Sequence, residues 1–429
     1  MVHYAFARRL VLCVGAVSSV VSFGLSSCGA SNSGSAGAPS SQTTPAPGAG
    51  SGLVQDKSPR PMTPLAKPAL FGTVTDAEFG TTIRRITAVS ASGSNPVIKP
   101  VYSTVSAWNA DESYLLLYEV ESGRHRLHNG RTYEFVRYLD ISPADIEQVY
   151  WHTSDPDLLF YVDGKTLIRY HVSDGRKEAV RSFEFCSADA SAGSDPLFTS
   201  WDSNRIGLGC GTQVFIYDIP TDTVTGRKPL NQNPAQVSPS GTLAYLSDVG
   251  IVTDAALNSL RVLDLREPFG HASLGQLTNG HDTWNGAVYD PGPKGNDDIG
   301  ILVTWDLTNA TSRVIVGPKT GWPYPPDGHI SMMAYKRPGW AFVSTQGATS
   351  GANLLDMEMV VADTNTGAVY RIGRHRTWGK DNTKLAESYW AEAHMVPSPT
   401  GTRAVFASDW GNGATVDSYV VELGALAPF

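Results

Sequence analysis

The feature that most constrains this chain is a pattern of short strands that recurs seven times. Each copy holds a short apolar strand, a turn rich in Asp, Ser, Pro, Gly or Asn, a second apolar strand, and a third strand after a polar gap. The copies cover residues 103–119, 148–172, 197–219, 235–265, 284–316, 330–363 and 394–423. A unit of this size cannot bury both faces of its sheet alone, so neighbouring units must pack against one another.

Radial packing of seven small sheets predicts an all-β fold, a seven-bladed β-propeller. Residues 82–89 are predicted to form a further strand before the first copy, whereas the last copy shows only three strands. We therefore expect the N-terminal strand to join the last blade and close the ring. The alternative, a pair of two-sheet sandwiches, does not account for seven copies with similar turns. The 42 Gly and 27 Pro among 429 residues agree with a turn-rich β protein.

Two turns resemble the Ser-Pro-Asp-Gly turn of TolB-like propellers. They are Ser238-Pro239-Ser240-Gly241 and Ser398-Pro399-Thr400-Gly401. Proline presets φ for such a turn, and glycine accepts the positive φ with which the chain reverses. The resemblance implies the fold, and it does not imply an activity.

The N-terminus has the pattern of an export signal. Arg8 and Arg9 precede residues 10–25, an uncharged stretch too short to span a membrane, so residues 1–27 are the expected signal peptide. The arginine pair also leaves a twin-arginine route open. The run Leu25-Ser26-Ser27-Cys28-Gly29 resembles the lipobox of bacterial lipoproteins. This resemblance implies a lipid on Cys28 and a place on a bacterial membrane, either the outer membrane or the cell surface; cleavage by ordinary signal peptidase is the alternative.

Composition then sets the domain boundaries. Residues 28–67 are expected to be a lipidated cysteine and a flexible linker, because residues 29–52 contain only Gly, Ala, Ser, Pro, Thr, Asn and Gln. The propeller is expected over residues 68–429. Cys186 and Cys210 either pair in an oxidising compartment or stay as two buried thiols. The net charge of −8, with no basic cluster, excludes a nucleic-acid partner.

Several polar residues are expected at one mouth of the central channel, where the chain enters the innermost strand of each blade. Three consecutive copies present His281, His329 and His394 at or near this position, and Glu392 lies two residues before His394. Positions two apart on a strand face the same side. Imidazole and carboxylate groups are ligands for one divalent metal such as Mn, Zn or Ca. The alternative is ordinary loop histidines that are solvated or bonded to backbone.

The histidine set, the run Ala391-Glu392-Ala393-His394 and the strand 403–409 resemble oligogalacturonate lyases and related propeller polysaccharide lyases. The resemblance implies that histidines of neighbouring blades bind a divalent metal. That metal neutralises a uronate carboxylate and assists β-elimination. The chain departs from the family at Glu392, where the family has the first histidine of a His-x-His pair. No residue here matches the family's catalytic base.

A ligand rim is expected near the same mouth. Its candidates are Trp284, Asp327, Trp322, Tyr324, Tyr389, Trp390 and Gln236. Aromatic faces stack on sugar rings and present polar edges to hydroxyl groups. The sequence therefore predicts a membrane-anchored, extracytoplasmic propeller that binds a glycan or a protein partner at the channel mouth. A metal-assisted oligouronide lyase is the alternative, so whether the chain is an enzyme stays open.

Overall fold

The computed structural model describes residues 52–190, 199–229, 233–268 and 271–429. The predicted signal peptide, Cys28 and most of the predicted linker lie outside these residues. The described residues form seven sheets, one per blade, and their helical segments are short 3₁₀ turns. These turns are η1 (Pro318–Thr320), η2 (Gly379–Asp381), η3 (Ser388–Ala391) and η4 (Gly424–Leu426).

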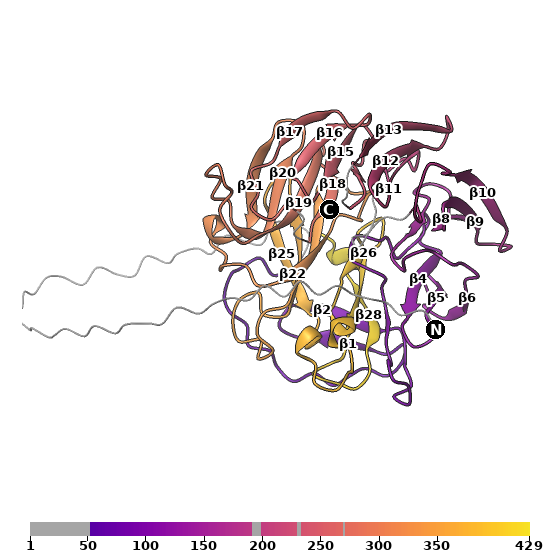
Figure 1. Cartoon of the computed structure of the whole chain (residues 1–429). Helices are drawn as coiled ribbons and strands as arrows, with labels where there is room; N and C mark the ends of the chain where they lie inside the picture. Colours follow the sequence, from indigo (N-terminus) through magenta and orange to yellow (C-terminus); the bar gives the residue numbers. More distant parts are fainter. Residues whose placement is uncertain (1–51, 191–198, 230–232, 269–270) are drawn as a thin grey trace, which may run out of the picture. The chain divides into compact units, whose positions relative to one another are not determined.

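The blades follow one another along the chain, each from its inner strand outward (Figure 1). Blade 1 holds β3 (Ile98–Lys99), β4 (Tyr114–Glu119), β5 (Arg124–Asn129) and β6 (Phe135–Tyr138). Blade 2 holds β7 (Val149–Trp151), β8 (Leu158–Asp163), β9 (Thr166–His171) and β10 (Lys177–Ser182). Blade 3 holds β11 (Arg205–Cys210), β12 (Gln213–Asp218) and β13 (Thr223–Pro229), with its inner position marked by the bridge Thr199–Ile206.

The remaining blades have the same antiparallel order. Blade 4 holds β14 (Gln236–Val237), β15 (Leu243–Leu246), β16 (Ile251–Asp254) and β17 (Ser259–Val262). Blade 5 holds β18 (Ser273–Gln276), β19 (Asp282–Val288), β20 (Gly300–Asp306) and β21 (Thr311–Val316). Blade 6 holds β22 (Gly328–Ser331), β23 (Trp340–Thr345), β24 (Glu358–Asp363) and β25 (Val369–Arg374). Blade 7 holds β26 (Val396–Pro397), β27 (Arg403–Ser408) and β28 (Asp417–Glu422), followed by β2 (Thr81–Arg85) and β1 (Thr73–Asp76).

The ring closes as the sequence predicts. Strand β2 pairs antiparallel with β28, with Ile83 opposite Val421. In Figure 1 the indigo strands β1 and β2 lie beside the yellow β28. Ile83 is fully buried in a core cluster that it shares with Phe342 of blade 6 and Phe406 of blade 7. Burying such side chains contributes about 1.5–3 kcal/mol each, so closure joins the two chain ends by core packing as well as by hydrogen bonds.

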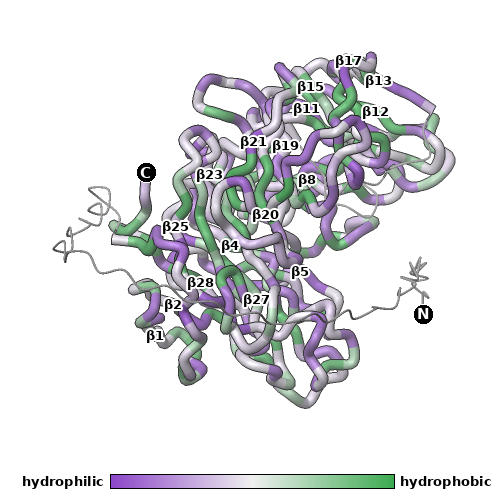
Figure 2. Tube along the Cα trace, turned by 90° about the vertical axis from the view of Figure 1, so that its left-hand side faces the viewer, coloured by the Kyte–Doolittle hydropathy of each residue, from purple (hydrophilic) through white to green (hydrophobic). Residues whose placement is uncertain are grey.

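The core consists of apolar side chains between adjacent blades. Hydrophobic stretches follow strands such as β20 and β27, and hydrophilic residues gather in the loops (Figure 2). The predicted turns end in glycines with positive φ: Gly241 and Gly401 both have φ of 73°. Each glycine amide donates to the carbonyl of the serine that begins its turn, at 2.8 Å. The turn chemistry therefore forms as predicted.

Two boundaries differ from the sequence prediction. The inner strand of blade 5 is β18, whereas the sequence placed it at residues 284–289, which lie mostly within the second strand, β19. Contacts with the propeller also begin earlier than the predicted boundary at Pro68, because Leu53 is buried and Val54 forms a β-bridge with Arg371. No helix among the described residues is long and apolar enough to cross a membrane.

Candidate metal centre

Polar side chains meet where the chain enters the inner strands of four blades. His329 lies on β22 of blade 6, and His394 lies two residues before β26 of blade 7. Glu392 directly follows η3, the 3₁₀ turn that precedes β26. Lys99 ends β3 of blade 1, and His271 lies two residues before β18 of blade 5. The radial fold therefore collects side chains that are distant in sequence.

His329, Glu392 and His394 form a group whose candidate ligand atoms all lie within 4.8 Å of one another. The Nε2 atoms of His329 and His394 lie 3.7 and 3.6 Å from the Oε2 atom of Glu392. Both Nε2 atoms are buried and have no hydrogen-bond partner among the described residues. Buried polar atoms normally have a partner, and a metal ion is a partner that two imidazole nitrogens facing one carboxylate would fit.

The distances between these donor atoms suit a divalent ion. An ion about 2.1 Å from two donors holds them about 3.4 Å apart at the tetrahedral angle. The observed 3.6 and 3.7 Å between each Nε2 and Glu392 require only a small contraction, within a set of atoms that all lie within 4.8 Å of one another. Two imidazoles and one carboxylate supply three ligands, so an ion held there would take at least one further ligand from elsewhere.

Burial sets the protonation of these groups. It holds the pKa of His329 and of His394 well below the ordinary value, and the charge of Lys99 lowers both further. Both imidazoles are therefore neutral at pH 7, as a metal ligand must be. Burial raises the pKa of Glu392, while Lys99 acts in the opposite direction.

A second layer of side chains surrounds the three candidate ligands. The Nζ atom of Lys99 contacts Nδ1 of His394 and lies over the rings of Tyr389 and Trp390, 5.5 and 5.4 Å from their centroids. Burial lowers the pKa of Lys99 to about 8, although Glu147 and Glu392 act to raise it. The sequence analysis missed Lys99, because a lysine is ordinarily expected in solvent.

His271 is the exposed member of this cluster. Its ring lies 4.7 Å from that of His329, and its Nδ1 lies 3.3 Å from the hydroxyl of Tyr102. The Tyr102 ring also packs against His329 and His394, at 5.5 and 4.9 Å. His271 and His394 have φ of 37° and 41°, a strained region for a residue with a Cβ. Such strain is concentrated at functional sites.

The structure does not bring His281 to this cluster. Because β18 is the inner strand of blade 5, His281 falls in the hairpin between β18 and β19. There its Nδ1 lies 2.7 Å from Oδ2 of Asp306. His271, which enters β18, takes the place in blade 5 that the sequence analysis assigned to His281. Had the inner strand of blade 5 been predicted at β18 rather than at β19, His271 would have been the histidine at its entry.

The candidate rim residues are scattered. Tyr389 is 46% exposed and lies 5.5 Å from the His394 ring, so it alone of the aromatic candidates is both exposed and beside the cluster. Trp390 is half-buried next to it, over Lys99. Asp327 pairs with Lys380 at 3.0 Å. The others lie elsewhere: Trp284 is in the core of blade 5, Gln236 and Trp322 are buried, and Tyr324 is exposed with its hydroxyl on the Tyr289 carbonyl.

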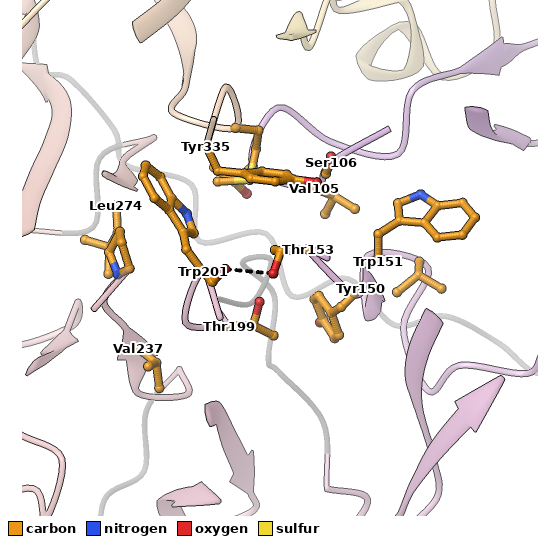
Figure 3. Close-up of a pocket in the computed structure, with 14 residues that line it drawn as sticks. Val105, Ser106, Tyr150, Trp151, Thr153, Thr199, Trp201, Val237, Leu274 and Tyr335 are labelled. Atoms are coloured by element: carbon orange, nitrogen blue, oxygen red, sulfur yellow. Dashed lines mark hydrogen bonds between the residues drawn. The ribbon is translucent and has the colours of Figure 1, made fainter. Parts of the chain in front are cut away.

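A small pocket lies among residues of the inner strands and of the segments that follow them. Tyr150, Trp151, Trp201 and Tyr335 line it (Figure 3). The hydroxyl of Thr153 donates to the Trp201 carbonyl at 2.7 Å, as the dashed line in Figure 3 shows. The lining carries no charged side chain. These aromatic residues therefore pack the blades together.

The structure joins Cys186 and Cys210 in a disulfide bond. Cys210 ends β11, and Cys186 lies in the loop after β10. The bond therefore links blade 2 to blade 3, and both cysteines are buried in the core cluster between these blades.

Comparison with known proteins places the fold. No protein-family model and no curated protein matches the chain. Among solved structures, an oligogalacturonate lyase in complex with manganese has a TM-score of 0.58 and 16% identity, over 83% of this chain and 97% of that one. An oligogalacturonate lyase from Vibrio parahaemolyticus has a TM-score of 0.57 and 14% identity, over 82% and 96%. The chain has the seven-bladed propeller fold of oligogalacturonate lyase. At these identities the likeness concerns the fold alone.

Proposed function

We propose that the chain is a divalent-metal-dependent propeller that acts on an acidic sugar, as a lyase working by β-elimination. The observation that carries this proposal is the pair of unpartnered Nε2 atoms, of His329 and His394, that face the carboxylate of Glu392. Similarity in fold to a lyase that binds manganese agrees with it. These three residues would hold the ion, and Mn²⁺ or Zn²⁺ suits their nitrogen-rich donor set better than Ca²⁺.

A bound divalent ion would neutralise the uronate carboxylate and so acidify the neighbouring C–H group. Within the chain, His271 is the candidate base, because its imidazole is exposed beside the cluster and its Nδ1 faces Tyr102. Its Nε2 would accept the proton, the electron pair of that C–H bond would form the new C=C bond, and the C–O bond to the leaving sugar would break. The leaving oxygen would take a proton from solvent. Exposed Tyr389 offers an aromatic face to the sugar ring.

Metal analysis and a product assay test this proposal. The purified protein should bind Mn²⁺ or Zn²⁺, and oligouronides should yield a 4,5-unsaturated product that absorbs in the ultraviolet. Glu392→Gln should lose metal and activity together, while His271→Asn should lose activity and retain metal. Absence of metal binding removes the lyase proposal.

A binding function without turnover is the second candidate. The observation in its favour is Glu392, which stands where oligogalacturonate lyases have a histidine. Its carboxylate adds negative charge next to the place where an anionic sugar would bind. In this case the metal-loaded protein would retain an oligouronide or another acidic glycan and release no unsaturated product. Direct binding measurements, made beside the product assay, separate the two candidates.

We further propose that the protein is exported and held at a bacterial membrane by lipid on Cys28. Support comes from the lipobox-like run at residues 25–29 and the linker composition after it. Cys28→Ala should release the protein from the membrane fraction. Continued association of that variant with membranes would contradict the anchor.

A further inference from the structure

Residues 53–67, here called the strap, lie along blade 6 and are held by their main-chain carbonyls. Arg371 of β25 binds three of these carbonyls: its amide donates to Val54 at 2.8 Å, and its Nη1 donates to Asp56 at 3.1 Å and to Ser58 at 2.9 Å. The strap therefore begins as a partner of the outer strand of this blade.

Three further side chains continue this pattern along the strap. The guanidinium of Arg374 donates to the carbonyl of Arg60, and Nη1 of Arg376 donates to the Thr63 carbonyl at 2.7 Å. The indole Nε1 of Trp410 donates to the Leu65 carbonyl at 2.9 Å. Arginine and tryptophan supply donors only, so they are matched to a row of acceptors.

The strap itself is suited to this role by its prolines. Pro59, Pro61 and Pro64 lie within it, and Pro68 follows it. Proline has no amide hydrogen and holds φ near the polyproline II value, so such a segment presents carbonyls and stays extended at little entropic cost. Most strap side chains are exposed, and Leu53 is its one buried residue. The main-chain carbonyls therefore form one continuous row of contacts. The side chains of Lys57, Arg60 and Lys67 add contacts with the Thr320 carbonyl, the Glu78 carbonyl and the Asp417 carboxylate.

On the propeller side, the arginines that contact the strap are buried and paired with a carboxylate. Arg371 and Arg374 are fully buried, and Arg371 is paired in bidentate fashion with buried Glu358, at 2.7 and 2.8 Å. Removing guanidinium groups from water is costly unless they are paired and hydrogen-bonded. The strap carbonyls add hydrogen bonds to these guanidinium groups, beyond those that Glu358 and the Asp356 carbonyl accept.

We propose that this edge of blade 6, with Trp410, is a peptide-binding surface for an extended proline-rich chain, recognised through its carbonyls. The strap is its ligand in cis, and it fastens the N-terminal part of the chain at one place on the propeller. The mode is that of aromatic- and arginine-lined grooves that bind preformed polyproline II segments. This role is separate from the proposed function of the metal centre.

The same surface leads to the metal centre. Arg376 is followed by Thr377, whose hydroxyl donates to the Ala391 carbonyl at 2.5 Å, and Glu392 is the next residue. Docking of the strap therefore supports the segment that carries Glu392. This coupling rests on the proposed function, whereas peptide recognition does not.

A trans-binding experiment tests the surface. In the full chain, residues 53–65 are replaced by a Gly/Ser segment of equal length, and a fluorescent peptide of residues 52–68 is titrated. The variant should bind the peptide, and the wild-type protein, whose surface is occupied, should bind it at least 10-fold more weakly. A peptide that keeps the prolines, Lys57, Arg60 and Lys67 in place and has the other residues permuted should bind within about threefold of the native one. The proposal is overturned if the variant is folded but fails to bind the peptide. It is also overturned if the variant binds a Gly/Ser peptide equally well.

A second measurement applies if the replaced chain does not fold. Arg60 and Lys67 precede proline, so within the strap trypsin cuts only after Lys57. Arg376→Lys combined with Trp410→Phe weakens two anchor points and keeps the stacking of ring 410 on Tyr419. Cleavage after Lys57 in the native protein should become several-fold faster. An unchanged rate would show that these donors do not hold the strap.

The metal centre gives an independent readout. Metal affinity should fall in the strap-replaced variant and recover when the peptide is added. Peptide binding without any effect on metal affinity would refute the coupling and leave the surface intact. If no form of the protein binds metal, the proposed function fails, and peptide binding still decides the present proposal.

Discussion

Replacing His329 by alanine should weaken metal binding about 100-fold, whereas replacing His281 should have no effect. His329 Nε2 is buried, lacks a partner among the described residues and lies 3.7 Å from Glu392. A complete four-ligand zinc site contributes about 10–16 kcal/mol, or about 3 kcal/mol per ligand. At about 1.4 kcal/mol per factor of ten, the loss of one ligand costs about two factors of ten in Kd.

Competition with a chromophoric chelator, using Mn²⁺ and Zn²⁺ in turn, measures this change in Kd. His281→Ala is the matched control, because it removes the same group from the hairpin beside Asp306. Its Kd should stay within about twofold of the wild-type value, and the Tm of both variants establishes that they are folded. Equal weakening by the two substitutions, or by neither, would refute the three-residue site.

Three further predictions concern stability. Glu358→Gln removes the buried carboxylate that pairs with Arg371 and Arg374, and it should cost about 3–5 kcal/mol. Calorimetry should show a fall in Tm of several degrees, whereas Glu178→Gln in an exposed pair should leave Tm unchanged. Reduction of the bond between Cys186 and Cys210, 24 residues apart, should cost about 3 kcal/mol, and an equal Tm with and without reductant would contradict this. Burial lowers the pKa of His125, His128 and His375 to about 4. Between about pH 6.5 and 4 the unfolded chain therefore binds protons that the folded chain does not, so the folded state loses stability as the pH drops. The denaturant midpoint should fall steadily over this range.

Much of the propeller could be predicted because its determinants are local. Short apolar strands and turns with proline and glycine recur at Ser238 and Ser398, and the extra strand around Ile83 indicates how the ring closes. Glu392 and His394 meet as predicted, but the strand argument behind that prediction does not apply, because both residues precede β26 and His394 has φ of 41°. The position of blade 5 could not be found in this way. Its inner strand, β18, is Ser-Leu-Gly-Gln and has little apolar content, so the sequence pattern favours the more apolar β19 as the inner strand.

The strap shows a second limit of the same kind. Its prolines and polar residues predict a linker, because no side chain after Leu53 is expected to enter a core. The structure holds it by backbone carbonyls that every residue carries, and a pattern of side chains does not reveal such contacts.

By itself, the order of residues determined that this chain forms seven small sheets and that its first strand completes the last of them, because strand and turn preferences act over a few neighbours. Only the tertiary structure decided which side chains meet. Lys99, His271 and Tyr102 come to His329 and His394 through the radial arrangement of the blades. Their chemistry depends on burial and on distances across the channel, and neither quantity exists until the ring has closed.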